Sequence, residues 1–504
     1  MEPRQLILLP VLIPLTGAFL ILLLRPWKSW QRRLAFFVML VSLLCSFWLL
    51  LQVWQSKTAA VYHLGGWVAP YGISLVADPL STFMVLMSQL VLLMGIIYSM
   101  GARDKAIQYP TFYPLFLCLA VGLTGAFLSG DLFNLFVFAE LLVISGTVLT
   151  AISDDRYGAE AAYKYYYISL LASTFLLLAI GCLYISYGSL NLADLAMRIR
   201  LNPAAPLLPV AIGLLSATFM VKSAVFPFHF WQPDFHSASS TPVSAMLSSV
   251  VVKLGIYGFL RMTTLLFVQQ SLQIRILLIS VGIFSVFFGG LSAIGTHNAK
   301  RMLAYSTLAQ VGFILVGISW NTPLSIAAAL VFAFNHSLIK SAMLMLAGSV
   351  ASRTGEKSAA FDILMGTGKH MPFAGLLFFI GGLALAGIPP TNGFISKYLI
   401  FNSGAALGEY AVLILLGLGG VLSLIYTMRA FQKIWWLPKK VGSSIKPEGD
   451  RLIAPAVLIV LILAFGIWAE PLVQISQTAG VWLQDPMNYL QAVLGPAVVM
   501  IAGG

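Results

Sequence analysis

The feature that most constrains this chain is a near-continuous succession of apolar segments. Apolar residues make up 59% of the 504 residues and charged residues only 9%, and the mean hydropathy is +0.92. Soluble domains carry about 25% charged residues, so a water-soluble enzyme of several domains is excluded. One helix of about 20 apolar residues suffices to cross a bilayer. We therefore expect an all-α polytopic membrane protein.

About fourteen segments are long and apolar enough to be transmembrane helices. They are 5–25, 34–55, 79–101, 110–129, 131–152, 162–188, 205–226, 241–264, 273–295, 301–319, 323–350, 372–404, 409–436 and 453–473. Proline removes a backbone donor and breaks a helix. Pro227 therefore predicts an interrupted seventh span, and Pro389 and Pro390 predict an interrupted twelfth. The first segment lacks a small-residue cleavage pattern, so we interpret it as a span and not as a removed signal peptide.

The basic residues indicate the orientation of the chain. Most of the 29 Lys and Arg lie in alternate connections, among them 25–33, 353–369 and 429–451. Such loops favour the cytoplasmic side, which places both termini outside and requires an even number of spans. The formal net charge of +12 is then mostly a consequence of topology and does not indicate a nucleic-acid partner.

The cysteines do not predict a metal centre. Cys45, Cys118 and Cys182 lie in apolar stretches with neither a CxxC pair nor a Cys/His cluster. A disulfide framework, an iron–sulfur site and a zinc site are therefore not expected. No nucleotide-binding glycine motif is present either, so the energy source is expected to be an ion gradient.

Five ionisable residues fall inside apolar segments, and they are the candidate functional residues. They are Glu140, Lys222, Lys253, Lys340 and Lys397. Each charge costs roughly 3 kcal/mol at the bilayer centre, so these groups must face one another or a hydrated interior. Such residues commonly carry protons. The alternatives are a structural ion pair for Glu140 and a snorkelling lysine at a helix end for Lys222.

His336 and Lys340 are spaced i, i+4 and share one face of a helix. Histidine is the natural intermediate of a proton relay, although a lone histidine in an apolar helix is more often a satisfied core residue. We therefore predict that His336 is part of the relay and leave the role of Lys340 open.

Three polar residues lie at the break of the seventh span: His229, Asp234 and His236. They are candidates for proton uptake or gating at Lys222, or for capping the helix that follows. Asp131 is expected to cap a helix.

The two interrupted, lysine-bearing spans predict internal repeats, as in secondary transporters. We expect two five-helix repeats, helices 4–8 and 9–13. Five helices is an odd number, so the second repeat must be inverted. The predicted organisation is 1–104 for helices 1–3, 105–268 for the first repeat, 269–437 for the second, and 438–504 for a hydrophilic loop, helix 14 and the tail.

Several motifs resemble those of the antiporter-like, proton-pumping subunits of complex I. They are PFHFWQPDFHSASSTPVSAMLSSVVVKLGIYGFLR, HNAKRMLAYSTLAQVGF, FNHSLIKSAMLMLAG and GIPPTNGFISK. Within that family, the stretch 65–86 is most similar to the Mrp multisubunit Na⁺/H⁺ antiporter branch, and the length argues against the longer A-type component of Mrp. The resemblance covers most of the chain.

The resemblance implies fourteen transmembrane helices, two inverted repeats and a role for each matched residue. Glu140 and Lys222 correspond to the family's glutamate–lysine pair, Lys253 to its bridging lysine, His336 to its helix-eleven histidine and Lys397 to its terminal lysine.

The implied function is Na⁺/H⁺ antiport driven by the proton-motive force, without a cofactor, in a bacterial inner membrane. The implied partners are the A-type, C-type and small subunits of an Mrp complex. The alternatives are a proton-pumping subunit of complex I or of a membrane-bound hydrogenase, and a membrane scaffold without transport.

Overall fold

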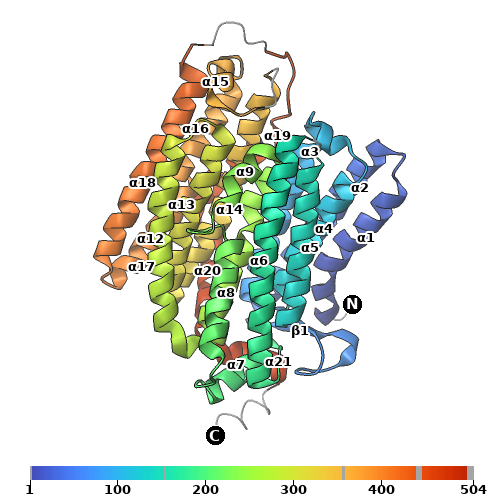
Figure 1. Ribbon diagram of the computed structural model, residues 1–504, viewed down its shortest axis with the longest axis vertical. Coiled ribbons are helices and arrows are strands. Elements are labelled where there is room, and N and C mark those ends of the chain that lie inside the picture. Colours follow the sequence, from blue (N-terminus) through green and yellow to red (C-terminus); the bar gives the residue numbers. More distant parts are fainter. Residues whose placement is uncertain (1–2, 153–154, 355–357, 439–444, 496–504) are drawn as a thin grey trace.

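The computed structural model describes residues 3–152, 155–354, 358–438 and 445–495. The loop cations Lys357, Lys439 and Lys440 lie outside these ranges. Long helices run roughly side by side through the molecule (Figure 1). Ten of the described helices are long and apolar enough to cross a membrane, or eleven if a bent pair is one span. The prediction of an all-α polytopic membrane protein is confirmed at this level.

The helices of the first half follow the predicted segments closely. They are α1 (Leu9–Leu23), α2 (Lys28–Ser56), α3 (Pro79–Gly101), α4 (Phe112–Leu128), α5 (Leu132–Ala151), α6 (Arg156–Tyr187), α7 (Leu192–Leu201), α8 (Leu208–Lys222), α9 (Trp231–Ala238), α10 (Thr241–Met246) and α11 (Lys253–Arg261). Short 3₁₀ or π turns adjoin them: η1 (Pro3–Leu8), η2 (Leu64–Gly66), η3 (Lys105–Gln108), η4 (Leu247–Val251) and η5 (Met262–Leu266). The turns η4 and η5 extend α10 and α11 into one segment, Thr241–Leu266.

The second half also contains long helices and one interrupted span. Its helices are α12 (Ser271–Gly295), α13 (Ala299–Ser319), α14 (Pro323–Ser352), α15 (Phe361–Leu364), α16 (Pro372–Ala386), α17 (Asn392–Ala406), α18 (Tyr410–Phe431), α19 (Ile453–Ile467), α20 (Glu470–Gln484) and α21 (Pro486–Leu494). The short turns are η6 (Val268–Gln270), η7 (Thr367–His370) and η8 (Gln432–Trp436).

The breaks occur where the prolines predict them. The helix α8 ends at Lys222 and α9 begins at Trp231, while α16 ends at Ala386 and α17 begins at Asn392. The second break is close-packed: a Cβ added to Gly393 would lie 1.8 Å from the Ala384 carbonyl oxygen. Each break therefore leaves helix ends inside the bundle, next to a lysine.

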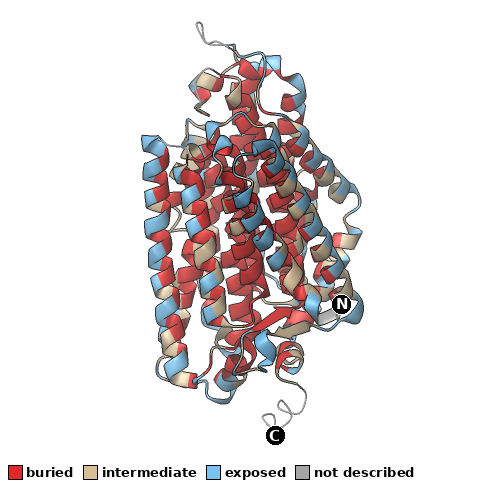
Figure 2. Cartoon of the chain, turned by 90° about the vertical axis from the view of Figure 1, so that its right-hand side faces the viewer, coloured by how far each residue is buried: buried red, intermediate tan, exposed pale blue. Residues whose placement is uncertain are grey.

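The centre of the bundle is formed by α13, α14 and the segment Thr241–Leu266, whose apolar stretches are almost or fully buried. A helix that is hydrophobic all round belongs in a core. By contrast, α1, α2 and α18 bury less than half of theirs, and Figure 2 shows the buried residues inside and the exposed ones outside. The candidate residues on the central helices are thus shielded on every side by protein.

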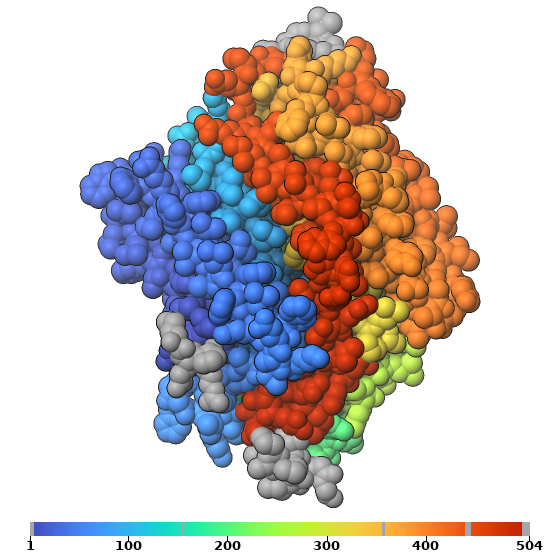
Figure 3. Space-filling model, turned by 180° about the vertical axis from the view of Figure 1, so that it is seen from behind, coloured from blue at the N-terminus to red at the C-terminus, as the bar shows by residue number. Residues whose placement is uncertain are grey.

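The two ends of the molecule differ. A hairpin that the sequence did not predict, β1 (Ala60–His63) with antiparallel β2 (Ser74–Ala77), lies at the same end as α7 and α21 (Figure 1). The small helix α15 lies at the other end. Figure 3 shows α19 and α20, which meet at an angle of 75°, running along the back face between the N-terminal helices and the α16–α18 region.

Candidate functional site

The centre of the site is a contact between two buried titratable side chains. Lys253 begins α11, and its Nζ lies 2.5 Å from Nδ1 of His336 on α14. Both side chains are fully or almost fully buried, and no ion pair is formed by either within the described ranges. Imidazole has two nitrogens, so it can accept a proton at one and release a proton from the other. The pair is therefore suited to proton transfer.

Lys340 lies one turn beyond His336 on the same face of α14 and is also fully buried. Its Nζ donates a hydrogen bond to the Leu303 carbonyl oxygen on α13, at 2.8 Å. The predicted shared face of His336 and Lys340 is present. Protonation of any one of these neighbouring groups disfavours protonation of the others, because like charges repel strongly in a buried site.

Lys397 lies on α17 immediately after the second break. Its Nζ donates hydrogen bonds to the carbonyl oxygens of Ala386 at 2.7 Å and Leu385 at 3.1 Å. These carbonyls belong to the last turn of α16, where carbonyl groups have no partner within the helix and a cation is favourable. The ammonium also lies 5.2 Å from the centroid of the Phe313 ring. The helix end created by the break in the twelfth span thus binds the ammonium group of Lys397 from the same span.

A small cavity lies between His336 and Lys397. Its volume is about 10 Å³, and Gln310 of α13 and Ser396 also line it. The Nε2 atom of His336 is buried and has no hydrogen-bond partner among the described residues. A cavity of this size has room for about one water molecule. His336 and Lys397 thus border one small cavity.

Glu140 and Lys222 are the first two candidate residues along the chain. The Glu140 carboxylate accepts a hydrogen bond from the Ser173 hydroxyl on α6, a contact that the sequence did not suggest. The Lys222 Nζ is buried and has no hydrogen-bond partner in the described part of the chain, although the Glu140 charge acts on it electrostatically. No ion pair within 4.0 Å joins them in the described part of the chain. The Glu140 carboxylate and the Lys222 ammonium therefore interact electrostatically but are not in direct contact.

The residues at the first break have different environments. Asp234 forms ion pairs with Lys164 at 2.9 Å and Arg301 at 3.0 Å, beside a cavity of about 670 Å³ at the end of the bundle. His236 is buried, with Nδ1 3.0 Å from the Ser244 hydroxyl oxygen. His229 is half-buried, and its Nδ1 has no partner.

The helix α10, which follows α9, begins at Thr241 as predicted, but it has no side-chain cap among the described residues. Asp131 does cap a helix: it accepts a hydrogen bond from the Asn134 N–H at 2.9 Å at the start of α5. Burial raises the pKa of this Asp131 carboxyl above its ordinary value.

The sequence reasoning missed one buried ion pair. Asp78 and Arg261 are not among the candidate residues of the sequence analysis, but both side chains are buried and joined by two hydrogen bonds. Arg261 also donates to the Tyr257 hydroxyl at 3.0 Å, and Tyr257 follows Lys253 by one turn on α11. Asp78 and Arg261 each lie at or near the end of an apolar segment, so the sequence does not indicate that their side chains are buried. Only the i, i+4, i+8 spacing of Lys253, Tyr257 and Arg261 could have indicated a polar face.

A bundle of membrane-spanning helices with titratable residues in its interior defines a protein of the ion-translocating class. The profile of the family described as "NADH:quinone oxidoreductase/Mrp antiporter, TM" matches residues 129–423. This range includes both helix breaks and all six candidate residues from Glu140 to Lys397. The chain belongs to this family of membrane subunits. The resemblance predicted from the motifs is thereby confirmed.

Individual relatives cover nearly the whole chain. The D subunit of the Na⁺/H⁺ antiporter of Bacillus subtilis is 32% identical over 97% of this chain and 99% of its own length. The N subunit of the NADH-quinone oxidoreductase of Desulforudis audaxviator is 32% identical over 81% of this chain and 83% of its own. A chain in the structure of the Mrp complex from Dietzia sp. superposes with a TM-score of 0.90 at 25% identity, covering 98% of this chain and all of that one.

Proposed function

We propose that this chain is the D-type membrane subunit of an Mrp Na⁺/H⁺ antiporter and that it conducts protons through Glu140, Lys222, Lys253, His336, Lys340 and Lys397. The observation that carries the proposal is the 2.5 Å contact between Lys253 and His336 deep in the bundle, with a cavity connecting His336 to Lys397. The proton-motive force drives the exchange, which supports pH and sodium homeostasis.

The proton path begins at the first break. Asp234 beside the end cavity, with His229 and His236, admits protons to Lys222. The Glu140 charge favours protonated Lys222, and separation of the two promotes release toward Lys253. In the separated arrangement, the Ser173 hydroxyl donates a hydrogen bond to the Glu140 carboxylate.

The second half of the path runs through the histidine. His336 accepts a proton from Lys253 at Nδ1 and releases one from Nε2 into the small cavity that Lys397 borders. Lys340 sets the charge beside this step, since its ammonium opposes protonation of His336. Lys397 then exchanges protons with the opposite side of the membrane.

The proposal includes the fold and assembly that the family resemblance implies. The shorter apolar helices α4, α8 and α16 and the bent pair α19–α20, added to the ten long spans, bring the number to fourteen. We assign helices 4–8 and 9–13 to inverted repeats with boundaries near 105, 268 and 437. The chain lies in a bacterial inner membrane with both termini outside, in a complex with the A-type, C-type and small subunits.

The direct test measures Na⁺-dependent pH change in vesicles that contain the assembled complex. Glu140→Ala and Lys222→Ala are expected to abolish exchange, while Glu409→Gln, which removes a partly exposed carboxylate that pairs with Arg275, retains it. Assembly is checked by co-purification of the other subunits. Unchanged exchange in either alanine variant, after assembly is verified, contradicts the proposal.

The second candidate is a proton-pumping subunit of a quinone-reducing complex, favoured by the 32% identity to the N subunit of an NADH-quinone oxidoreductase. The two candidates differ in energy source. Exchange driven by a pH gradient alone, without an electron donor, supports the antiporter. Proton movement that requires quinone reduction supports the alternative.

A further inference from the structure

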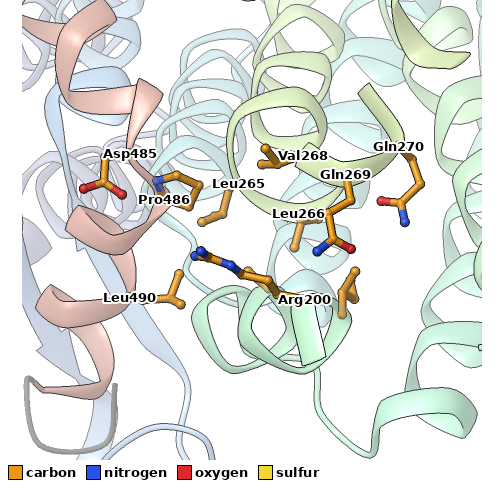
Figure 4. Close-up of a pocket in the computed structure, with 11 residues that line it drawn as sticks. Arg200, Leu265, Leu266, Val268, Gln269, Gln270, Asp485, Pro486 and Leu490 are labelled. Carbon is orange, nitrogen blue, oxygen red and sulfur yellow. The ribbon is translucent and has the colours of Figure 1, made fainter. Parts of the chain in front are cut away.

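Two adjoining hollows lie at the end of the bundle where α7 and α21 lie. The first has a volume of about 270 Å³, and four of its eleven lining residues are polar: Arg200, Gln269, Gln270 and Asp485 (Figure 4). The second is an apolar groove of about 460 Å³ between α8 and α12. Gln270 lines both hollows, so they form one continuous surface with a polar end and an apolar end.

The groove has the length of one lipid leaflet. Its wall on α8 extends from Leu208 to Met220, which at 1.5 Å per residue is about 18 Å. The hydrocarbon core of a bilayer is about 30 Å thick, so one leaflet is about half of that. The groove starts at the helix ends and runs inward, as an acyl chain does.

Unpartnered polar atoms border this surface. Ser216 is 4% exposed, and its hydroxyl, on the wall of the apolar groove, has no hydrogen-bond partner. The Gln270 side-chain oxygen is also buried and unpartnered. Buried polar groups in native proteins are nearly always satisfied. The Ser216 donor on the groove wall therefore indicates a ligand that carries an oxygen acceptor on its stem.

The charges at the polar end indicate the head group. Arg200 reaches from α7 toward α21, and among the described residues it forms no ion pair; its Nη1 contacts only the Met487 sulfur at 3.2 Å. Asp485 starts α21 on the opposite wall. A guanidinium binds phosphate strongly, and a carboxylate binds an ammonium group. The arrangement is complementary to a zwitterion.

We propose that this surface is a binding site for one phosphatidylethanolamine molecule. The phosphate binds Arg200, and the ammonium group binds Asp485. The Ser216 hydroxyl donates to an ester carbonyl, and one acyl chain lies in the groove between α8 and α12. This site is separate from the proton path, and its occupancy ties α7 and α21 to the first broken span.

The test uses Gly213, an exposed glycine on the groove wall. A Cβ added there meets nothing within 4 Å, so Gly213→Phe fills the groove without a clash inside the protein. Gly181 on α6 is the matched control, because a Cβ added there also meets nothing. Arg200→Gln is paired with Lys57→Gln, an exposed cation beside β1.

The measurement is native mass spectrometry of the purified complex after delipidation and addition of phosphatidylethanolamine or phosphatidylcholine. We expect the fraction of this chain that retains phosphatidylethanolamine to fall about tenfold in Gly213→Phe and in Arg200→Gln, as for the loss of one charge-assisted hydrogen bond. Both controls should retain it. Phosphatidylcholine, whose methylated head group donates no hydrogen bond, should bind more weakly to the wild type.

Three outcomes overturn the proposal. They are equal retention of the two lipids, retention unchanged by both site variants, and equal loss in the control variants. A photoreactive benzoylphenylalanine at position 213 tests whether a neighbouring protein of the complex covers the groove instead. Crosslinking to lipid supports the proposal, and crosslinking to a protein contradicts it.

Discussion

The Arg261 guanidinium binds both carboxylate oxygens of Asp78, with Nη1–Oδ2 and Nη2–Oδ1 distances of 2.6 and 2.8 Å. The pair joins the start of α3 to the end of α11, and the rings of Tyr257 and Tyr489 lie on the guanidinium at 5.0 Å. It therefore links the helix that carries Lys253 to the start of α3 and to the C-terminal helix α21.

Removal of one partner from this pair should strongly destabilise the protein. Asp78→Asn keeps a residue that can cap α3, but it leaves Arg261 buried without a counter-charge, at a cost of about 3–5 kcal/mol. The loss of stability is measured as the change in the free energy of unfolding in detergent. The control is Glu409→Gln, whose partly exposed pair with Arg275 contributes about 0–1 kcal/mol. Equal losses in the two variants would show that burial of the pair has no consequence.

Lys253→Arg separates the charge of the residue from its ability to release a proton. Arginine keeps a cation next to His336 but is not deprotonated in proteins. We expect the complex to assemble and the proton flux in vesicles to fall about 100-fold or more, the contribution of one positioned acid–base group. The loop variant Lys446→Gln should leave the flux unchanged. Wild-type flux in Lys253→Arg would remove Lys253 from the path.

Two substitutions at Lys397 distinguish its structural role from its transport role. Lys397→Met leaves the carbonyls of Leu385 and Ala386 without a donor, which should cost about 1–3 kcal/mol of stability. Lys397→Gln retains a donor and should recover part of that stability, but its amide does not titrate and so cannot pass on a proton. Both variants should lose exchange, as measured by Na⁺-dependent pH change. Transport by the glutamine variant at the wild-type rate would limit Lys397 to a structural role.

Gly255 sets the distance between α11 and the end of α8. A Cβ added there would lie 2.0 Å from the Ser223 hydroxyl oxygen and 2.4 Å from the Phe219 carbonyl oxygen. Gly255→Ala should therefore separate the helices and cost about 1–3 kcal/mol. Gly181→Ala, with nothing within 4 Å, should be neutral or slightly stabilising. The thermal midpoints of the two variants provide the comparison, and similar midpoints would contradict the close approach.

Asp450 should give the protein a pH-dependent stability. Burial raises the pKa of its carboxyl above the ordinary 3.8, although hydrogen bonds from the Tyr98 hydroxyl at 2.7 Å and the Arg103 N–H at 2.9 Å oppose this. The folded state then binds the proton more tightly than the unfolded state does. The contribution of this group is therefore largest at low pH and is lost as the pH rises through the raised pKa.

The variant Asp450→Asn does not titrate, so its stability relative to the wild type should increase as the pH rises from about 4 to about 7. Unfolding midpoints measured over that range test the sign. Parallel curves for the two proteins would show that Asp450 has an ordinary pKa.

The amino-acid sequence alone determined the class of the fold and the candidates for the site. The long apolar segments require helices, because a backbone in hydrocarbon must satisfy its own hydrogen bonds. The prolines at 227, 389 and 390 located both breaks, because proline cannot continue a helix interior. Glu140 and the four lysines are identified by their position in apolar segments, because a charge there is energetically costly and commonly marks a functional site.

Only the tertiary structure decided which of these groups meet. The Lys253–His336 contact joins residues 83 positions apart, and Arg261 reaches Asp78 across 183 positions, so neither follows from local spacing. The sequence analysis does not select Asp78 and Arg261, because each lies at or near the end of an apolar segment. In the bundle, the packing of α3, α11 and α21 buries them together. Long-range packing, which determines what shields each charge from solvent, cannot be read from the hydropathy of single segments.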